Sequence, residues 1–141
     1  MSGHEFVDTN IWLYALVDPT HSNDSDKHLR AAQLVRQLSR PVISSQVARE
    51  LCRNLLKKSA LTEENLRRLI DDWYPNCVLH ASSQQQHLLA SQLRETASFS
   101  FWDSLIVAAA LDAGCSTLYS EDMQHGQVVD GRLTIVNPLL G

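Results

Sequence analysis

The hydrophobic positions of this chain follow two alternating patterns, short apolar runs and longer stretches with helical spacing. The short runs predict strands at 4–8, 42–43, 76–80, 117–119 and 133–136. The longer stretches predict helices at 11–17, 24–38 and 101–113, one from Thr62 to about 74 and one from Ser82 or Ser83 to about 95. A further helix begins at Ser44 or Ser45 and carries Val47, Leu51, Leu55 and Leu56, and the segment 121–131 is predicted to be a loop.

Short strands that alternate with longer helices are typical of parallel strand pairing. The pattern therefore predicts an α/β fold with a central parallel sheet of four to five short strands flanked by helices. The 141 residues are about one average domain long. No repeat or linker divides them, so we expect a single domain over residues 1–141.

The composition excludes several classes of protein. Hydrophobic residues make up 44% of the chain and charged residues 20%, a balance typical of a globular protein. No apolar run reaches the roughly 20 residues that span a bilayer, and the first residues resemble no secretion signal. The three cysteines lie far apart, which does not fit a disulfide framework, and the six histidines lack the spacing of zinc ligands. We therefore expect a cytoplasmic protein with reduced thiols and no membrane partner.

The charge of the chain is strongly polarised. Its formal net charge of −4, taken alone, argues against nucleic-acid binding. The stretch from Lys27 to Arg68, however, holds ten basic residues and three acids, a net charge of +7, whereas the remainder holds two basic residues and thirteen acids, or −11. Such a distribution suits an enzyme that holds cations and grips a polyanion. Solvated helix faces with an accidental charge bias are the alternative.

Four acidic residues stand where the functional crevice of a parallel sheet is expected. That crevice lies beyond the carboxyl ends of the strands. Asp8 directly follows the first predicted strand, and Asp122 follows the strand at 117–119. Glu50 and Asp103 lie on predicted helices that would pack around the same crevice.

Each of these acids also has a simpler structural explanation. Asp8 can cap the following helix, and Asp103 can belong to a capping box that starts at Ser100. Glu50 can pair with a nearby cation, and Asp122 can be a turn residue. Together, however, clustered carboxylates repel one another unless a cation offsets their charge. A hard divalent cation held by such a cluster can polarise a phosphodiester and activate a water molecule.

Basic side chains accompany Glu50 on its predicted helix. Glu50, Arg53, Asn54 and Lys57 fall at positions i, i+3, i+4 and i+7, which share one helix face. This face would place cations beside a carboxylate, as a metal site next to a phosphate grip requires. Our candidates for gripping the substrate backbone are Arg49, Arg53, Lys57 and Lys58.

Four segments carry a resemblance to a known family. They are Phe6-Val7-Asp8-Thr9-Asn10-Ile11, Ala48-Arg49-Glu50-Leu51, Phe101-Trp102-Asp103-Ser104-Leu105-Ile106 and Tyr119-Ser120-Glu121-Asp122-Met123. In order and spacing these segments resemble the PIN-domain pattern. The chain is similar over essentially its whole length to VapC-type toxins, the ribonucleases of bacterial toxin–antitoxin pairs.

The resemblance implies a Mg²⁺- or Mn²⁺-dependent endoribonuclease with four catalytic and metal-binding acids, Asp8, Glu50, Asp103 and Asp122. Asp8 and Asp103, with Glu50 or Asp122, would hold one or two ions while water attacks an RNA phosphodiester. The products would carry 5′-phosphate and 3′-hydroxyl ends. The implied partners are an RNA substrate, a cognate antitoxin and a second copy of this chain in a homodimer.

Polar helpers are implied beside these acids. Thr9 or Asn10 would serve at the first motif, and Ser120 at the last. Glu121 is a rival for the last acidic position, but the Ser-x-Asp spacing favours Asp122.

Other classes of protein remain as alternatives. A phosphatase of the haloacid-dehalogenase type needs a second acid where this chain has Asn10, and a phospho-receiver domain needs a late Lys, whereas none follows Lys58. A PIN-like RNA- or protein-binding module with an unused site is the serious alternative. Trp12, Trp73 and Tyr74 can belong to an interface, although aromatic residues at helical spacing favour the core.

Overall fold

The structure is a computed structural model of the chain, and it describes residues 4–19, 24–58 and 61–140. Its first half contains β1 (His4–Val7), α1 (Thr9–Leu16), α2 (Ser25–Gln37), β2 (Val42–Ser44), α3 (Ser45–Lys58) and α4 (Glu63–Trp73). A 3₁₀ turn (Tyr74–Asn76) leads to β3 (Val78–His80), α5 (Gln84–Thr96), α6 (Phe101–Asp112), β4 (Cys115–Tyr119), β5 (Val128–Val129) and β6 (Leu133–Val136). Among the described helices, none is long and apolar enough to cross a membrane.

The strands form one sheet in the order β3-β2-β1-β4-β6-β5. All neighbours are parallel except β5, which runs antiparallel to β6. The predicted α/β class with a central, mostly parallel sheet is therefore confirmed. The predicted number of four to five strands is wrong, because the described residues form six. The additional strand is β5, whose two residues lie inside the segment predicted to be a loop and are too few to produce an alternating pattern.

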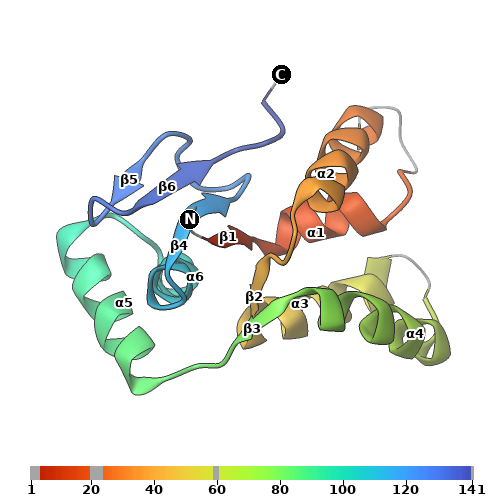
Figure 1. Cartoon of the computed structure of the whole chain (residues 1–141), viewed down its shortest axis with the longest axis horizontal. Helices are drawn as coiled ribbons and strands as arrows, with labels where there is room; N and C mark the ends of the chain where they lie inside the picture. The colour runs from red at the N-terminus through yellow and green to blue at the C-terminus, as the bar shows by residue number, and fades with distance from the viewer. Residues whose placement is uncertain (1–3, 20–23, 59–60, 141) are drawn as a thin grey trace.

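Helices flank the sheet on two sides. Figure 1 shows α1 to α4 gathered on one side of the sheet, and α5 and α6 together on the other. Helix α6 is buried along most of its length, from Ser104 to Leu111. An apolar helix of this kind fits a position against the sheet rather than at the surface. The core that these layers enclose includes Phe6, Ile43 and Leu118, all fully buried.

Strand β1 lies between β2 and β4 and determines where the site forms. Val7, the last residue of β1, aligns with Tyr119, the last residue of β4. The backbone N–H of Asp8 donates to the carbonyl of Tyr119 at 3.0 Å, so Asp8 and Ser120 leave the sheet side by side. The chain continues from β1 to β2 on one side, while β4 lies on the other. A switch point of this kind is where open α/β sheets bind their ligands.

Side-chain caps fix the starts of the helices. Thr62, Ser83 and Ser100 each accept a hydrogen bond from a backbone N–H in the first turn of α4, α5 and α6. Between the two serines considered for α3, Ser44 is the one whose hydroxyl accepts, from the N–H of Val47. Helix α1 begins at Thr9, two residues before the predicted start, because Asp8 caps it.

The aromatic residues that could have formed an interface belong to the core. Trp12 and Trp73 are buried, with ring centroids 6.4 Å apart, and Tyr74 packs against Trp73 at 5.1 Å. The three cysteines are free thiols, and Cys77 and Cys115 are buried. The two tryptophans and these two cysteines therefore contribute to the packing of the core.

Candidate active site

A cleft of about 160 Å³ opens at the carboxyl ends of β1 and β4, and we call it the acidic cleft. It is lined by Asp8, Thr9, Asn10, Gln46, Glu50, Trp102, Asp103, Ile106 and Asp122. The four predicted acids come from positions as far apart in the chain as 8 and 122, and the fold brings all of them to this one cleft. Caps and turns account for single acids, but they do not account for four carboxylates around one opening.

Asp8 is the most deeply placed of these acids, with only 9% of its surface exposed. One carboxylate oxygen accepts from the backbone N–H of Thr9 at 2.8 Å, and the other accepts from the Ser120 hydroxyl at 3.0 Å. Burial raises the pKa of Asp8 to about 6, although these two hydrogen bonds act in the opposite direction. The negative charges of Glu50 and Asp103 contribute to this rise.

Asp103 lies in the first turn of α6. Its backbone N–H donates to the hydroxyl of Ser100 at 3.1 Å, as the capping-box spacing predicts. That cap occupies the backbone of Asp103 and leaves its carboxylate to line the cleft. Glu50, half-buried on α3, reaches the same cleft from the other side of β1. Asp103 can therefore take part in the helix cap and line the cleft at the same time.

Asp122 and Glu121 face different surroundings. Asp122 lines the acidic cleft and accepts a hydrogen bond from the side-chain amide of Asn10. Burial raises the pKa of Asp122, and the charges of Glu121 and Asp103 add to this effect. Glu121 instead pairs with Lys27 at 2.7 Å. The geometry favours Asp122 as the fourth acid, as the Ser-x-Asp spacing predicts.

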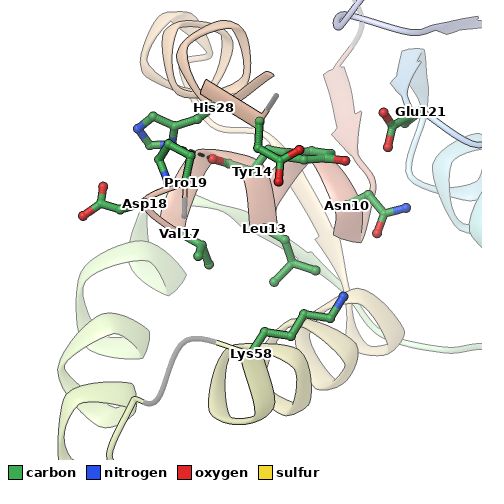
Figure 2. Close-up of a pocket in the computed structure, with 10 residues that line it drawn as sticks. Asn10, Leu13, Tyr14, Val17, Asp18, Pro19, His28, Lys58 and Glu121 are labelled. Carbon is green, nitrogen blue, oxygen red and sulfur yellow. Dashed lines mark hydrogen bonds between the residues drawn. The ribbon is translucent and has the colours of Figure 1, made fainter. Parts of the chain in front are cut away.

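A second pocket of about 340 Å³ adjoins the acidic cleft, and Asn10 lines both. Figure 2 shows this pocket, with Glu121 on one side and Lys58 approaching from α3. Lys58 is one of the four basic candidates for substrate binding. The others, Arg49, Arg53 and Lys57, are exposed on α3, and the described lining of the acidic cleft includes no lysine or arginine.

The donors of the acidic cleft fit a hard divalent cation. Such ions prefer oxygen ligands, and the cleft offers four carboxylates together with the buried Thr9 hydroxyl, which has no hydrogen-bond partner among the described residues. Over the same residues, no group of three His, Cys, Asp or Glu side chains lies close enough to hold a metal ion. Mg²⁺ commonly binds through one or two carboxylates and several waters, so this spacing is compatible with it.

Three residues line the cleft that were not predicted to belong to the site, Gln46, Trp102 and Ile106. Gln46 precedes Glu50 by one helical turn, and Ile106 follows Asp103 by three residues, so helical spacing from the predicted acids could have found both. Trp102 directly precedes Asp103, and no spacing rule would have placed it on the rim. The sequence marked Lys27 only as part of the basic stretch. Its contact with Glu121 joins residues 94 positions apart, which local spacing does not predict.

The burial of Asp8 predicts a pH effect on stability in metal-free buffer. Its pKa is raised from an ordinary value of 3.8 to about 6, so the folded state binds this proton more tightly than the unfolded state. The resulting stabilisation is complete below about pH 4 and is lost as the pH rises through 6. The loss amounts to about 3 kcal/mol.

Urea unfolding of the wild type and of Asp8→Asn, measured in EDTA from pH 4 to 7, tests this effect. The substitution removes the titrating group, so the free energy of unfolding of Asp8→Asn should gain about 3 kcal/mol on that of the wild type across this range. Parallel pH profiles for the two proteins would show that Asp8 titrates near its ordinary value.

Comparisons with known proteins identify the family and the fold of the chain. The family model for the PIN domain matches residues 6–130. The solved structure of VapC20 from Mycobacterium tuberculosis, described as a toxin that cleaves the sarcin–ricin loop, is similar with a TM-score of 0.62 and 17% identity over 84% of this chain and 89% of that one. A toxin–antitoxin complex from Klebsiella pneumoniae contains a chain with a TM-score of 0.70 and 18% identity, over 96% of this chain and 97% of that one. No curated protein sequence matches significantly. Since the family model covers all four acids and most of the chain, this protein belongs to the PIN domain family.

Proposed function

We propose that this protein is a Mg²⁺- or Mn²⁺-dependent endoribonuclease, the toxin of a toxin–antitoxin pair. The observation that carries the proposal is the convergence of four carboxylates from separate segments on one cleft at the switch point of the sheet. Of the two solved structures described above, one is described as a toxin that cleaves the sarcin–ricin loop and the other as a toxin–antitoxin complex, which supports this proposal.

The residues of the cleft have separate tasks in this proposal. The carboxylates of Asp8 and Asp103, with Glu50 or Asp122, would hold one or two cations, each ion through one or two carboxylates and several waters. Ser120 and the Thr9 backbone orient Asp8 through the hydrogen bonds that they donate to it. Asn10 orients Asp122 in the same way. A bound divalent cation supplies Lewis-acid activation of the phosphodiester and of the attacking water.

Phosphates farther along the RNA would meet the exposed basic side chains of α3. Arg49, Arg53, Lys57 and Lys58 are exposed there, and each can contact a phosphate without reaching the acidic cleft. An antitoxin that covers the cleft and a homodimer of the toxin complete the proposed assembly. Light scattering of the purified chain checks the dimer.

The function is tested by incubating the purified chain with RNA in EDTA, and then again after Mg²⁺ or Mn²⁺ is added. We expect internal cleavage only when a divalent ion is present, with 5′-phosphate and 3′-hydroxyl ends on the products. RNA that stays intact in every metal, although the protein binds it, would instead favour the module with an unused site. Sequencing of the cut ends identifies the target.

A further inference from the structure

An exposed tryptophan stands at the rim of the acidic cleft. Trp102 lies in the first turn of α6 directly before Asp103, and 65% of its surface is exposed although it also lines the cleft. The other two tryptophans of the chain, Trp12 and Trp73, are buried. A side chain of this size normally buries most of its surface. Its exposure at the candidate active site therefore indicates that a ligand covers it.

Trp102 packs against one neighbouring side chain, which is itself contacted from α5. Its ring meets that of Phe101 edge to face, with centroids 5.1 Å apart. The guanidinium of Arg94 lies over the Phe101 ring at 4.7 Å and also donates to the hydroxyl of Ser104 at 2.8 Å. These contacts position Phe101 from the α5 side, and Phe101 in turn supports Trp102. An aromatic ring that is already ordered loses little conformational entropy when it binds.

The electrostatics of the cleft create a need for such a side chain. The described lining contains four acids and neither lysine nor arginine, so it repels a polyanion when no cation is present. Attraction to phosphate would come from a bound cation and from basic side chains outside this lining, such as Lys58 in the adjoining pocket. An aromatic ring binds nucleic acid through the face of a base, which does not depend on charge.

We propose that Trp102 stacks against an unpaired RNA base next to the phosphodiester that is cleaved. This inference rests on the proposed function and names the residue that contacts a substrate base at the same site. A base inside a duplex already has both faces covered by its neighbours, whereas an unpaired base in a loop or a single strand can splay out onto a ring.

The shape of the surface beside Trp102 fits an extended strand. A further pocket of about 460 Å³ shares Asp103 and Asp122 with the acidic cleft and continues it toward Phe99 and Gln127. The pocket shown in Figure 2 adjoins the cleft at Asn10. The acidic cleft therefore shares lining residues with two further pockets, and Trp102 stands at its rim.

The fluorescence of Trp102 gives a direct test. Because Trp12 and Trp73 are buried, quenching by a ligand at the surface reports mainly on Trp102. An unstructured oligoribonucleotide is titrated into the protein in Ca²⁺, and its affinity is measured independently by the anisotropy of a dye on the RNA. A gel confirms that the RNA stays intact during the titration. A hairpin of the same base composition serves as the paired substrate.

We expect the oligoribonucleotide to quench the fluorescence and the hairpin to bind more weakly. Trp102→Ala should lower the affinity for the unpaired RNA about 5- to 150-fold. Trp102→Phe should keep most of the affinity but lose the quenching. Leu88→Ala, a truncation of an exposed apolar side chain on α5 away from the cleft, should change neither. Since Trp102 is mostly exposed, both of its variants should fold like the wild type.

Three results would overturn the inference. They are an unchanged affinity in Trp102→Ala, equal binding of the hairpin and the unpaired RNA, and a variant that loses self-association or antitoxin binding while its RNA affinity stays constant. The last result would assign Trp102 to a protein interface. Failure of the proposed function looks different: RNA binding that depends on Trp102, without cleavage in Mg²⁺ or Mn²⁺, keeps the stacking site and rejects the nuclease.

Discussion

Asp103→Asn is expected to lower the rate of RNA cleavage by at least about 100-fold while leaving the fold intact. The substitution keeps the shape of the side chain and the backbone bond to Ser100, but it removes one of the negative charges that would hold the cation. Loss of a metal ligand weakens both the binding of the ion and its orientation. The measurement is the single-turnover cleavage rate at a Mn²⁺ concentration that saturates the wild type, with circular dichroism to verify the fold.

The matched control is Asp71→Asn, which removes the same charge from the exposed face of α4. It should keep the wild-type rate, because Asp71 lies outside the described lining of the acidic cleft. Equal rates for Asp103→Asn and the wild type would remove the acidic cleft from the reaction.

Phe6→Ala is expected to lower the free energy of unfolding by about 3–5 kcal/mol. Phe6 is fully buried in β1, where it pairs with Val42 of β2 and Leu118 of β4. Truncation removes the apolar burial of the ring and leaves a cavity at the centre of the sheet. Because β1 also positions Asp8, we expect cleavage to be lost at temperatures where the weakened sheet unfolds. Urea unfolding at constant pH measures the change.

Leu29→Ala provides the comparison for this measurement. Leu29 is an exposed residue of α2, so its truncation should change the free energy of unfolding by less than about 0.5 kcal/mol. A loss below about 1 kcal/mol in Phe6→Ala would mean that β1 is not the packed centre of the sheet.

The positions of the four acids relative to predicted elements were readable from the sequence. Asp8 and Asp122 follow apolar strands, and parallel strands bring their carboxyl ends to one edge. The register between Val7 and Tyr119 then places these two segments side by side. The PIN family was also predicted correctly from the motifs. The catalytic roles of the acids stay predictions that the substitutions above test.

Other features depend on long-range packing, which local patterns do not encode. Strand β5 forms only because β6 offers it a partner, and its two residues carry no periodic signal. The surroundings of Glu121 depend on its ion pair with Lys27 of α2, a residue far away in the sequence. The residue spacing predicted that basic residues share a helix with Glu50. It did not predict how far from the acids their side chains would lie.

The net charge of the chain also says little about where charges lie in the folded protein. A value of −4 argues against a nucleic-acid partner only if charge is spread evenly. In the structure, four of the sixteen acids line one cleft, whereas Arg49, Arg53, Lys57 and Lys58 belong to α3. A cation in the cleft would offset the local repulsion and leave α3 available for phosphate.

The central claim is tested most directly by a Mn²⁺ titration of the purified protein with RNA. Bound Mn²⁺ is followed by electron paramagnetic resonance, and cleavage is recorded in the same samples. We predict that Mn²⁺ occupancy and cleavage rise together in the wild type and in Asp71→Asn, and that both are lost in Asp103→Asn. Cleavage that proceeds without bound Mn²⁺ or another divalent ion, or Mn²⁺ binding and cleavage that survive in Asp103→Asn, would contradict a metal-dependent nuclease at the acidic cleft.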